Sequence, residues 1–288
     1  MLQQRSDEFD VIVVGARCAG SPLASLLASR GLSVCLVDRD DFPSDTPSTH
    51  GIQPSGVEAL ERLGILARIQ AVTPPVEAGF LAFGEHRVRV DDAARITGAP
   101  MYCVRRVTLD EILLDAARDA GANVRTGTTV TGLLRSGGRV AGVETTKGPL
   151  PARLLVGADG ARSTVARLLG AEEYHRTPAH RVFLWSYFEG VDEDERRVWL
   201  GGIGEDNFLA MPTDSDLFLA AFVAPMRRRD EVRKDRTGAF EEGVRRWPEL
   251  REALAPARRA QPVQLMSNWH GFFRRSAGPG WALVGDAG

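Results

Sequence analysis

Lysine and cysteine are scarce in this chain of 288 residues. The only lysines are Lys147 and Lys234, so arginine carries nearly all of the positive charge. The three cysteines, Cys18, Cys35 and Cys103, share no spacing typical of metal ligands, which argues against a metal site. A sparse, odd set of cysteines suits a reducing cytosol, and we therefore expect a cytoplasmic protein.

Long apolar runs and a strong net charge are also absent. No apolar run approaches membrane-spanning length, and no signal peptide precedes the first predicted strand, so we expect no membrane span. The formal net charge of -2 gives no reason to expect nucleic acid as a partner. The hydrophobic fraction of 43% is that of an ordinary globular protein, and the length suits one large or two modest domains.

The first informative motif is GARCAG at residues 15–20, which follows a predicted buried strand, Phe9–Val14. A helix and a second strand are predicted over residues 21–37, so the segment has the order and size of a βαβ unit. In such a turn, backbone N–H groups and the helix dipole favour a bound phosphate. Gly15 permits the tight turn, and Gly20 permits close packing of the helix on the strand. The motif therefore predicts a dinucleotide site.

The middle position of this fingerprint is usually glycine, but here it is Arg17. An arginine there either adds a charge-assisted phosphate contact or crowds the phosphate through its Cβ. Asp38 ends the second strand, where an acid accepts hydrogen bonds from the adenosine ribose; the alternative is that it only begins a turn. We predict that Ala16, Arg17, Ala19, Asp38 and Arg39 contact the cofactor.

Two further motifs follow apolar strands later in the chain. GADGARS at residues 157–163 precedes a short predicted helix, and its Asp159 is either a cofactor ligand or an N-cap worth about 1 kcal/mol. GDAG at residues 285–288 contains Asp286 and follows a strand predicted over residues 281–284. Each motif is a weak signal alone, and the order of the three is what makes them informative.

Together the motifs resemble the FAD-dependent monooxygenases of the aromatic-hydroxylase type, which are similar to p-hydroxybenzoate hydroxylase. The resemblance covers essentially the whole chain. It implies that Asp159 and Gly160 help to hold the FAD pyrophosphate and that Asp286 binds the ribityl chain. RRVTLD at residues 105–110 resembles the family's Arg-x-x-Leu/Phe-Asp element, so Arg106 is expected near the flavin phosphate and ribityl region. A solvated arginine at a helix start is the equal alternative for Arg106.

The resemblance also implies an α/β fold, in which a Rossmann-like FAD-binding domain is interrupted by a β-rich substrate domain. We assign residues 1–76, 101–180 and 278–288 to the FAD-binding domain. The substrate domain takes residues 77–100 and 181–277, where aromatic-rich strands are predicted. No second glycine-rich strand–helix turn is present, so a separate nicotinamide domain is not expected.

In the resembling family, NADH or NADPH reduces FAD and O2 then forms a C4a-hydroperoxyflavin. The oxygen passes to a small apolar or aromatic substrate, which is hydroxylated or epoxidised. Because the cofactor supplies the oxidising chemistry, the lack of a catalytic triad or metal cluster is consistent with this activity. No single side chain is assigned as catalytic.

Three alternatives stay open. A flavin-dependent halogenase uses a lysine in its first domain, but none precedes Lys147, and its Trp-x-Trp-x-Ile-Pro segment has only a poor match at residues 208–212. A geranylgeranyl-reductase-like flavoprotein, which would reduce isoprenoid double bonds, ranks second. Its Pro-x-x-x-x-Cys-Gly segment falls near residues 47–51, where the cysteine is missing. The third alternative is an inactive FAD-binding fragment.

The chain ends directly after the third motif. In the resembling family, that motif opens a loop and a helix whose N-terminus faces the flavin. From the sequence we therefore expect a truncated chain that binds FAD weakly and, once reduced, releases peroxide wastefully.

Overall fold

The computed structural model describes residues 8–48, 51–191 and 196–288. The chain forms two compact units. The first unit comprises Met1–Asp45, Val107–Arg176 and Phe272–Gly288, and the second comprises Thr46–Arg106 and Thr177–Gly271. Residues 46–76 and 101–106 thus pack with the second unit, whereas the sequence assignment placed them in the FAD-binding domain. The division into a cofactor domain and a substrate domain stays a prediction.

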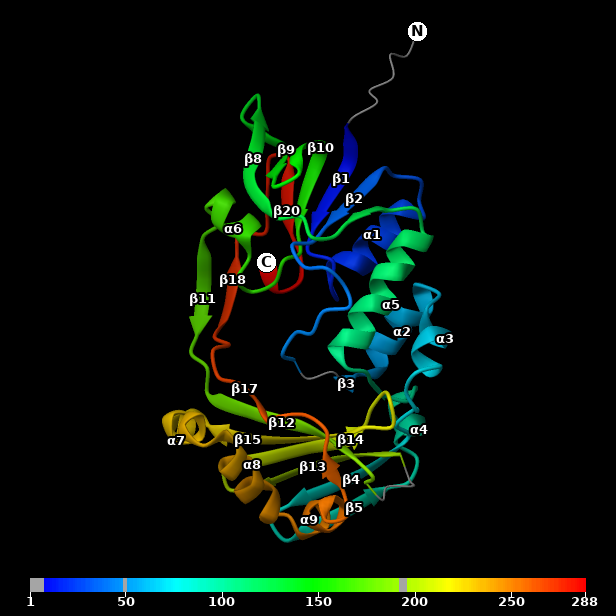
Figure 1. Cartoon of the computed structure of the whole chain (residues 1–288), viewed down its shortest axis with the longest axis vertical. Helices are drawn as coiled ribbons and strands as arrows, with labels where there is room; N and C mark the ends of the chain where they lie inside the picture. Colours follow the sequence, from blue (N-terminus) through cyan, green and yellow to red (C-terminus); the bar gives the residue numbers. More distant parts are fainter. Residues whose placement is uncertain (1–7, 49–50, 192–195) are drawn as a thin grey trace. The chain divides into compact units, whose positions relative to one another are not determined.

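A mainly parallel sheet forms the centre of the first unit (Figure 1). Its strands run in the order β19, β20, β10, β1, β2 and β7. Their bounds are Ala277–Gly278, Trp281–Leu283, Gly148–Gly157, Phe9–Val14, Val34–Val37 and Asn123–Arg125. All neighbours pair in parallel except β19 and β20. The predicted strand near residue 281 is therefore confirmed, next to β10.

Layers on both faces bury this sheet. The helices of the first unit are α1, α5 and α6, with the bounds Gly20–Ala28, Arg106–Asp119 and Thr164–Leu169. On β1, Val11 and Val13 belong to a core cluster with Ala24 of α1 and Leu114 of α5. The alternate β1 side chains instead join a cluster with Val165 of α6. Burial on both faces explains why β1 and β2 read as continuous apolar runs.

Two antiparallel additions complete the first unit. The strands β8 (Val130–Ser136) and β9 (Arg139–Thr145) form a meander with the first half of β10. A separate ribbon is formed by β11 (Glu173–Thr177) and β18 (Gly271–Arg274).

The second unit is built on a mixed sheet in the order β16, β12, β15, β14, β13, β4 and β5, and β17 also pairs with β12. In that order the bounds are Arg258–Arg259, Arg181–Glu189, Phe218–Pro225, Asp206–Pro212, Arg197–Ile203, Ala78–Phe83 and His86–Val90, with β17 at Gln264–Met266. The described pairs are antiparallel except β13 with β4. A small pair, β3 (Gly51–Ile52) with β6 (Tyr102–Cys103), lies outside this sheet.

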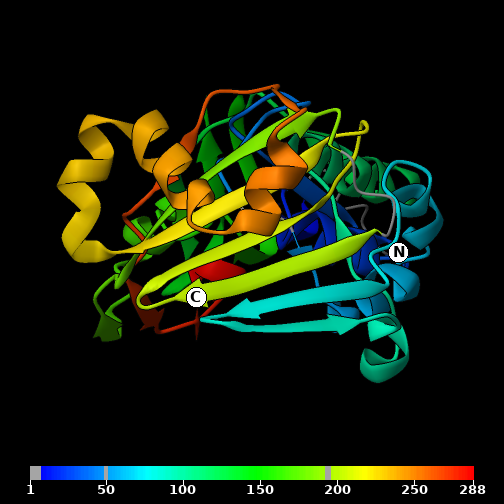
Figure 2. The same cartoon turned by 90° about the horizontal axis from the view of Figure 1, so that it is seen from below.

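Helices cover one face of the second-unit sheet, where α8 and α9 cross its strands (Figure 2). The helical elements of this unit are α2 (Pro54–Arg62), α3 (Leu66–Gln70), α4 (Ala93–Thr97), η1 (Met226–Arg228), α7 (Arg229–Lys234), α8 (Arg236–Arg245) and α9 (Pro248–Leu254). Phe240 and Trp247 pack from the helical layer against Phe222 of β15 and Phe208 of β14. Among the described residues, no helix is both long and apolar enough to cross a membrane.

The α/β fold class predicted from the sequence is confirmed, and most predicted elements exist. The helical segment α2–α3 is interrupted where Gly64 adopts a left-handed φ of 71°. Pro248 begins α9, a position where its missing N–H costs nothing.

The close approach of α8 to β15 makes a stability prediction. A Cβ on Gly243 would lie 2.5 Å from the ring of Phe222, which is fully buried. We expect Gly243→Ala to lower the free energy of unfolding by about 1–2 kcal/mol, because overpacking outweighs alanine's better helix propensity. Glu242→Ala, at an exposed position of the same helix, is the control and should change it by less than about 0.5 kcal/mol in a denaturant titration. An unchanged midpoint for Gly243→Ala would contradict the packing described for this helix.

Candidate functional site

The three sequence motifs follow neighbouring parallel strands at the same edge of the first-unit sheet. Val14 pairs with both Val37 and Gly157, and Gly157 pairs with Leu283. Hydrogen bonds continue past the strand ends: the Ala158 N–H donates to Val14 O at 2.7 Å, and the Val284 N–H donates to Gly157 O at 2.9 Å. In open α/β sheets, ligands bind beyond these carboxyl ends. The tertiary structure therefore gathers the motifs where such a ligand would sit.

Glycine is required where the first and second motifs meet. Gly15 has a φ of 103°, and a Cβ there would lie 2.4 Å from the carbonyl oxygen of Ala158. A Cβ on Gly20 would lie 1.8 Å from the carbonyl oxygen of Gly15, so both ends of the turn exclude any larger residue. A Cβ on Gly285 would lie 2.8 Å from Cβ of Ala19, which places the third motif against the first.

The helix after this turn begins without a side-chain cap. Ala19 occupies the N-cap position of α1 and makes no side-chain hydrogen bond to the helix. Within this first turn the Ser21 N–H already donates to Arg17 O at 3.0 Å and Pro22 has no N–H, so few donors are left for an external acceptor, but the helix dipole favours an anion there. The arrangement suits a phosphate group.

Asp38 lies at the end of β2 and is 6% exposed. Its Oδ2 accepts the Ala16 N–H at 2.7 Å, and its Oδ1 accepts the Asp40 N–H at 2.9 Å. The Ala16 N–H therefore points at Asp38, and a contact of Ala16 with the cofactor stays a prediction. Each carboxylate oxygen can accept a further hydrogen bond, so Asp38 both shapes the turn and can still receive a ribose hydroxyl.

Arg17 turns toward the protein. Its Nη1 donates to Asp110 Oδ2 at 2.7 Å, and its Nη2 donates to Ser44 Oγ at 2.7 Å and to Asp40 Oδ2 at 3.1 Å. Burial lowers the pKa of Arg17, but the hydrogen bond and charge of Asp110, the hydrogen bond to Asp40 and the charge of Asp38 outweigh it and raise this pKa above its usual value. Asp110 belongs to the RRVTLD element, where sequence reasoning considered only the arginine.

Asp159 accepts hydrogen bonds at the start of the helix that follows it. Its Oδ2 accepts the N–H groups of Thr164 at 2.7 Å and Val165 at 3.1 Å, and its Oδ1 accepts the Ser163 hydroxyl at 2.5 Å. The Ser163 hydroxyl in turn accepts the Ala166 N–H at 2.8 Å. The N-cap position of α6 is thus Ser163 and not Asp159, which instead accepts the first N–H groups of the helix from upstream. A cofactor role for Asp159 stays a prediction.

The other predicted cofactor residues are less constrained. Gly160 has a φ of 78° and open space around its Cβ position. Asp286 is exposed in the short helical turn η2 (Gly285–Ala287), and the side chain of Arg39 is 75% exposed. Arg106 is half-buried at the start of α5, four residues before Asp110. Their contacts with FAD stay predictions.

Arg274 links the second and third motifs through hydrogen bonds. No pattern in the sequence indicated this role. It is 8% exposed, and its Nη1 donates to Ala287 O at 3.1 Å. Its Nη2 donates to Ala161 O at 2.8 Å and to Glu173 Oε1 at 2.7 Å. The hydrogen bond from Arg274 is the chief reason that the pKa of Glu173 is lowered.

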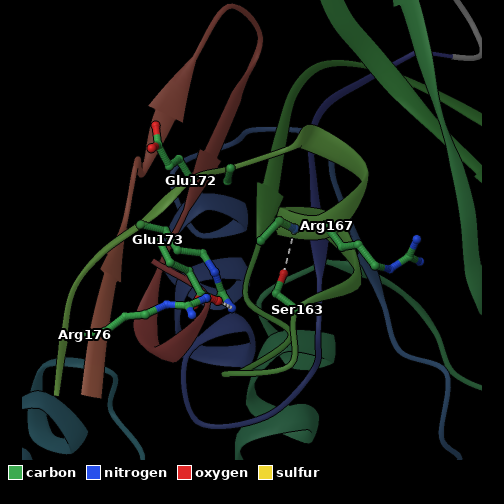
Figure 3. Close-up of a pocket in the computed structure, with 8 residues that line it drawn as sticks. Ser163, Arg167, Glu172, Glu173 and Arg176 are labelled. Carbon is green, nitrogen blue, oxygen red and sulfur yellow. Dashed lines mark hydrogen bonds and ion pairs between the residues drawn. The ribbon is translucent and has the colours of Figure 1, made fainter. Parts of the chain in front are cut away.

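A cleft of about 430 Å³ opens beside these ion pairs, lined by Ser163, Ala166, Arg167, Ala171, Glu172, Glu173, Arg176 and Arg274. Figure 3 shows Glu173 and Arg176 directed toward each other, whereas Arg167 and Glu172 point away from them. Glu173 pairs with both Arg274 and Arg176, so its charge is already compensated. The ion pairs in the lining of this cleft therefore stabilise the neighbouring motif loops. The lining gives no reason to assign a ligand to the cleft.

The buried thiols offer no nucleophile. Burial raises the pKa of Cys103 to about 12 and the pKa of Cys35 to about 11, so both stay protonated at neutral pH. Within the described part of the chain, no group of His, Cys, Asp and Glu side chains is arranged to hold a metal ion.

The cap on α6 makes a second prediction. Asp159→Ala removes the acceptor of two backbone N–H groups, so we expect the free energy of unfolding without cofactor to fall by about 1–2 kcal/mol. Asp286→Ala, in the exposed aspartate of the third motif, is the matched control and should change it by less than about 0.5 kcal/mol. Equal stability of the two variants in urea would show that Asp159 does not stabilise the start of α6.

Comparisons with known proteins agree with this arrangement. A family model described as an FAD binding domain matches residues 8–287. The menaquinone reductase of Mycolicibacterium smegmatis is 34% identical over 180 residues, covering 62% of this chain but only 44% of that protein. The 6-methylpretetramide 4-monooxygenase of Streptomyces rimosus is 27% identical over 288 residues, covering 96% of this chain and 68% of that protein.

A solved structure shows the same architecture. The myxobacterial chondrochloren halogenase CndH superposes with a TM-score of 0.85 at 25% identity, covering 98% of this chain and 68% of its own. The present chain thus spans about two thirds of the length of some relatives and less than half of others. Because the family model spans nearly all of the chain, the protein belongs to the FAD binding domain family.

Proposed function

We propose that the first unit binds FAD through the turn at residues 15–20, with Asp38 receiving the adenosine ribose. The observation that carries this proposal is the convergence of the three motifs at the carboxyl ends of β1, β10 and β20. The uncapped start of α1 would favour the anionic pyrophosphate through the helix dipole, and Gly160 and Asp286 are proposed to contact the cofactor further along.

The residues of this site fit such a group. Glycine at positions 15 and 20 brings backbone close to the space that a pyrophosphate would occupy, and Asp38 keeps an acceptor capacity on each oxygen. Close backbone approach and a free acceptor suit a dinucleotide, since its phosphates accept hydrogen bonds from N–H groups and its ribose hydroxyls donate to an acceptor.

For the whole enzyme we propose an NADH- or NADPH-dependent monooxygenase that acts on an apolar or aromatic substrate. Among the relatives described above, the one that matches 96% of this chain is named as a monooxygenase, and that match extends through the second unit. When bound, FAD would supply the transfer of electrons from the nicotinamide and the activation of O2. The protein's own part is to bind, orient and exclude water.

An apolar face of the second-unit sheet supports this substrate class. The strand register places one row of side chains across the face opposite the helices: Val88, Leu81, Leu200, Leu209, Ala221 and Trp185. Val88 is 50% exposed and Leu200 is 37% exposed, so the face is not fully covered. Beside this row, the exposed Trp269 packs edge-on against Phe183 with ring centroids 4.8 Å apart. Such a surface would hold a flat apolar molecule.

A quinone-linked oxidoreductase is the second candidate, favoured by the 34% identity to a menaquinone reductase. That match covers 62% of this chain, so it argues less strongly for the second unit. Residues 49 and 50, within the segment examined for the prenyl-reductase alternative, lie outside the described residues.

The first test addresses the cofactor. Asp38→Asn keeps the shape of the side chain but removes its charge, so we expect FAD affinity to fall about tenfold because the ribose hydroxyls lose a charged acceptor. Affinity is measured by quenching of flavin fluorescence, with FMN as the ligand that lacks adenosine. Asp45→Asn, on an exposed side chain, should leave both affinities unchanged. If Asp38→Asn lowers the affinity for FAD and FMN equally, or lowers neither, Asp38 does not bind the ribose.

The second test addresses the reaction. With FAD, NADH or NADPH, isotopically labelled O2 and 1-naphthol as an aromatic probe, we expect label in a hydroxylated product. If menadione is reduced instead and no label is incorporated, the quinone-linked alternative holds.

The same assay locates the substrate surface. Leu200→Asp should raise KM for the probe about tenfold or more, since a charge replaces apolar contact, while FAD affinity stays unchanged. Leu32→Asp is the matched control, because Leu32 is 38% exposed and lies in the first unit, and it should leave KM unaltered. A KM unaffected by Leu200→Asp would place the substrate elsewhere.

A further inference from the structure

The half-buried Arg17, at the position where the fingerprint usually has glycine, pairs with the buried Asp110. We propose that Arg17 is a positioning residue, whose guanidinium neutralises Asp110 and fastens the nucleotide turn, and that it is not a phosphate ligand. This inference rests on the proposed FAD site and concerns how its turn is held.

The donors of Arg17 are engaged by protein groups on two other segments. Asp110 lies on α5, and Asp40 and Ser44 lie on the loop after β2. The guanidinium also lies 5.3 Å from the ring centroid of Phe42, on that same loop. The side chain is only 19% exposed, so the arginine is held inside this network. A guanidinium that turned to a phosphate would have to give up these contacts.

Asp110 has strong reason to keep a cation beside it. Its carboxylate is fully buried, and a buried charge without a partner is costly because it has lost its hydration. The thiol of Cys18 adds a second contact, donating to Asp110 Oδ1 at 3.4 Å. Arg17 and Cys18, which are consecutive in the turn, thus both donate to the carboxylate of Asp110, and these contacts attach the turn to α5.

The negative charges around the turn affect what a glycine at position 17 would do to FAD binding. Asp38, Asp40 and Asp110 lie near the segment that is proposed to receive an anionic pyrophosphate. Arg17 pairs with two of these carboxylates, so its removal would take away a positive charge that balances them and would strengthen their repulsion of the ligand. Restoring the usual glycine should therefore weaken binding, although it recreates the common fingerprint.

The experiment is a double-mutant cycle on the full chain. Arg17→Gly should lower FAD affinity about tenfold or more, and adding Asp110→Asn should recover most of that loss, because a neutral amide needs no cation. Arg17→Lys keeps the charge and should lose less than Arg17→Gly, which also covers the case in which the glycine variant folds poorly. Affinities come from flavin fluorescence, and apoprotein unfolding temperatures are measured beside them.

Arg228→Gly is the matched control. Arg228 is 20% exposed and pairs with the buried Asp206 in the second unit, so this variant should lower the unfolding temperature without changing FAD affinity. A phosphate ligand at Arg17 would give a different pattern, because FAD would have lost its own contact with the guanidinium and Asp110→Asn would not rescue Arg17→Gly. That pattern would overturn the proposal.

The two proposals fail in distinguishable ways. If the unaltered chain binds no FAD, the proposed function is wrong, and the apoprotein unfolding temperatures then decide the pairing alone. In that case a glycine variant as stable as the unaltered chain, or no recovery in the double variant, would refute the role of Arg17.

Discussion

The close contact between the turns after β1 and β10 is the constraint on which the site depends. The backbone of Gly15 approaches Ala158 so closely that a methyl group would fall 2.4 Å from its carbonyl oxygen. Hydrogen bonds between the ends of neighbouring strands stabilise this geometry. The turn at Gly285 packs against Ala19. The three motifs thereby lie next to one another, because parallel strands bring their carboxyl ends to a common edge.

Arginine-centred ion pairs hold the loops around that framework and around the second sheet. Asp110, Asp214 and Asp206 are all buried, and each is paired with arginine. Arg105 binds Asp214 through its backbone N–H and two side-chain nitrogens. A planar guanidinium with five donors can join several acceptors at once, which the ammonium group of lysine does less well. The scarcity of lysine thus agrees with how the described loops are fastened.

Side chains alternate along the strands of the second unit, so that one face of the sheet packs in the core and the other forms the proposed substrate surface. On β14 and β15, Phe208 and Phe222 face the helices, whereas Leu209 and Ala221 face the opposite side. The helical layer buries the first set and gives the sheet its core. The other face keeps apolar side chains such as Leu200 partly exposed, so the same strands can support both stability and the proposed substrate surface.

The sequence by itself determined the βαβ unit, the requirement for glycine at positions 15 and 20, and the placement of Asp38 at a strand end. These follow from local periodicity and from turns that span only a few residues. Tertiary structure decided the partner of Arg17, because Asp110 lies 93 residues away. It also decided the clamp made by Arg274, whose acceptor Ala161 lies 113 residues away, and the packing of residues 46–76 with the second unit. Contacts at such separations depend on how the sheets assemble, and no local pattern of residue types encodes them.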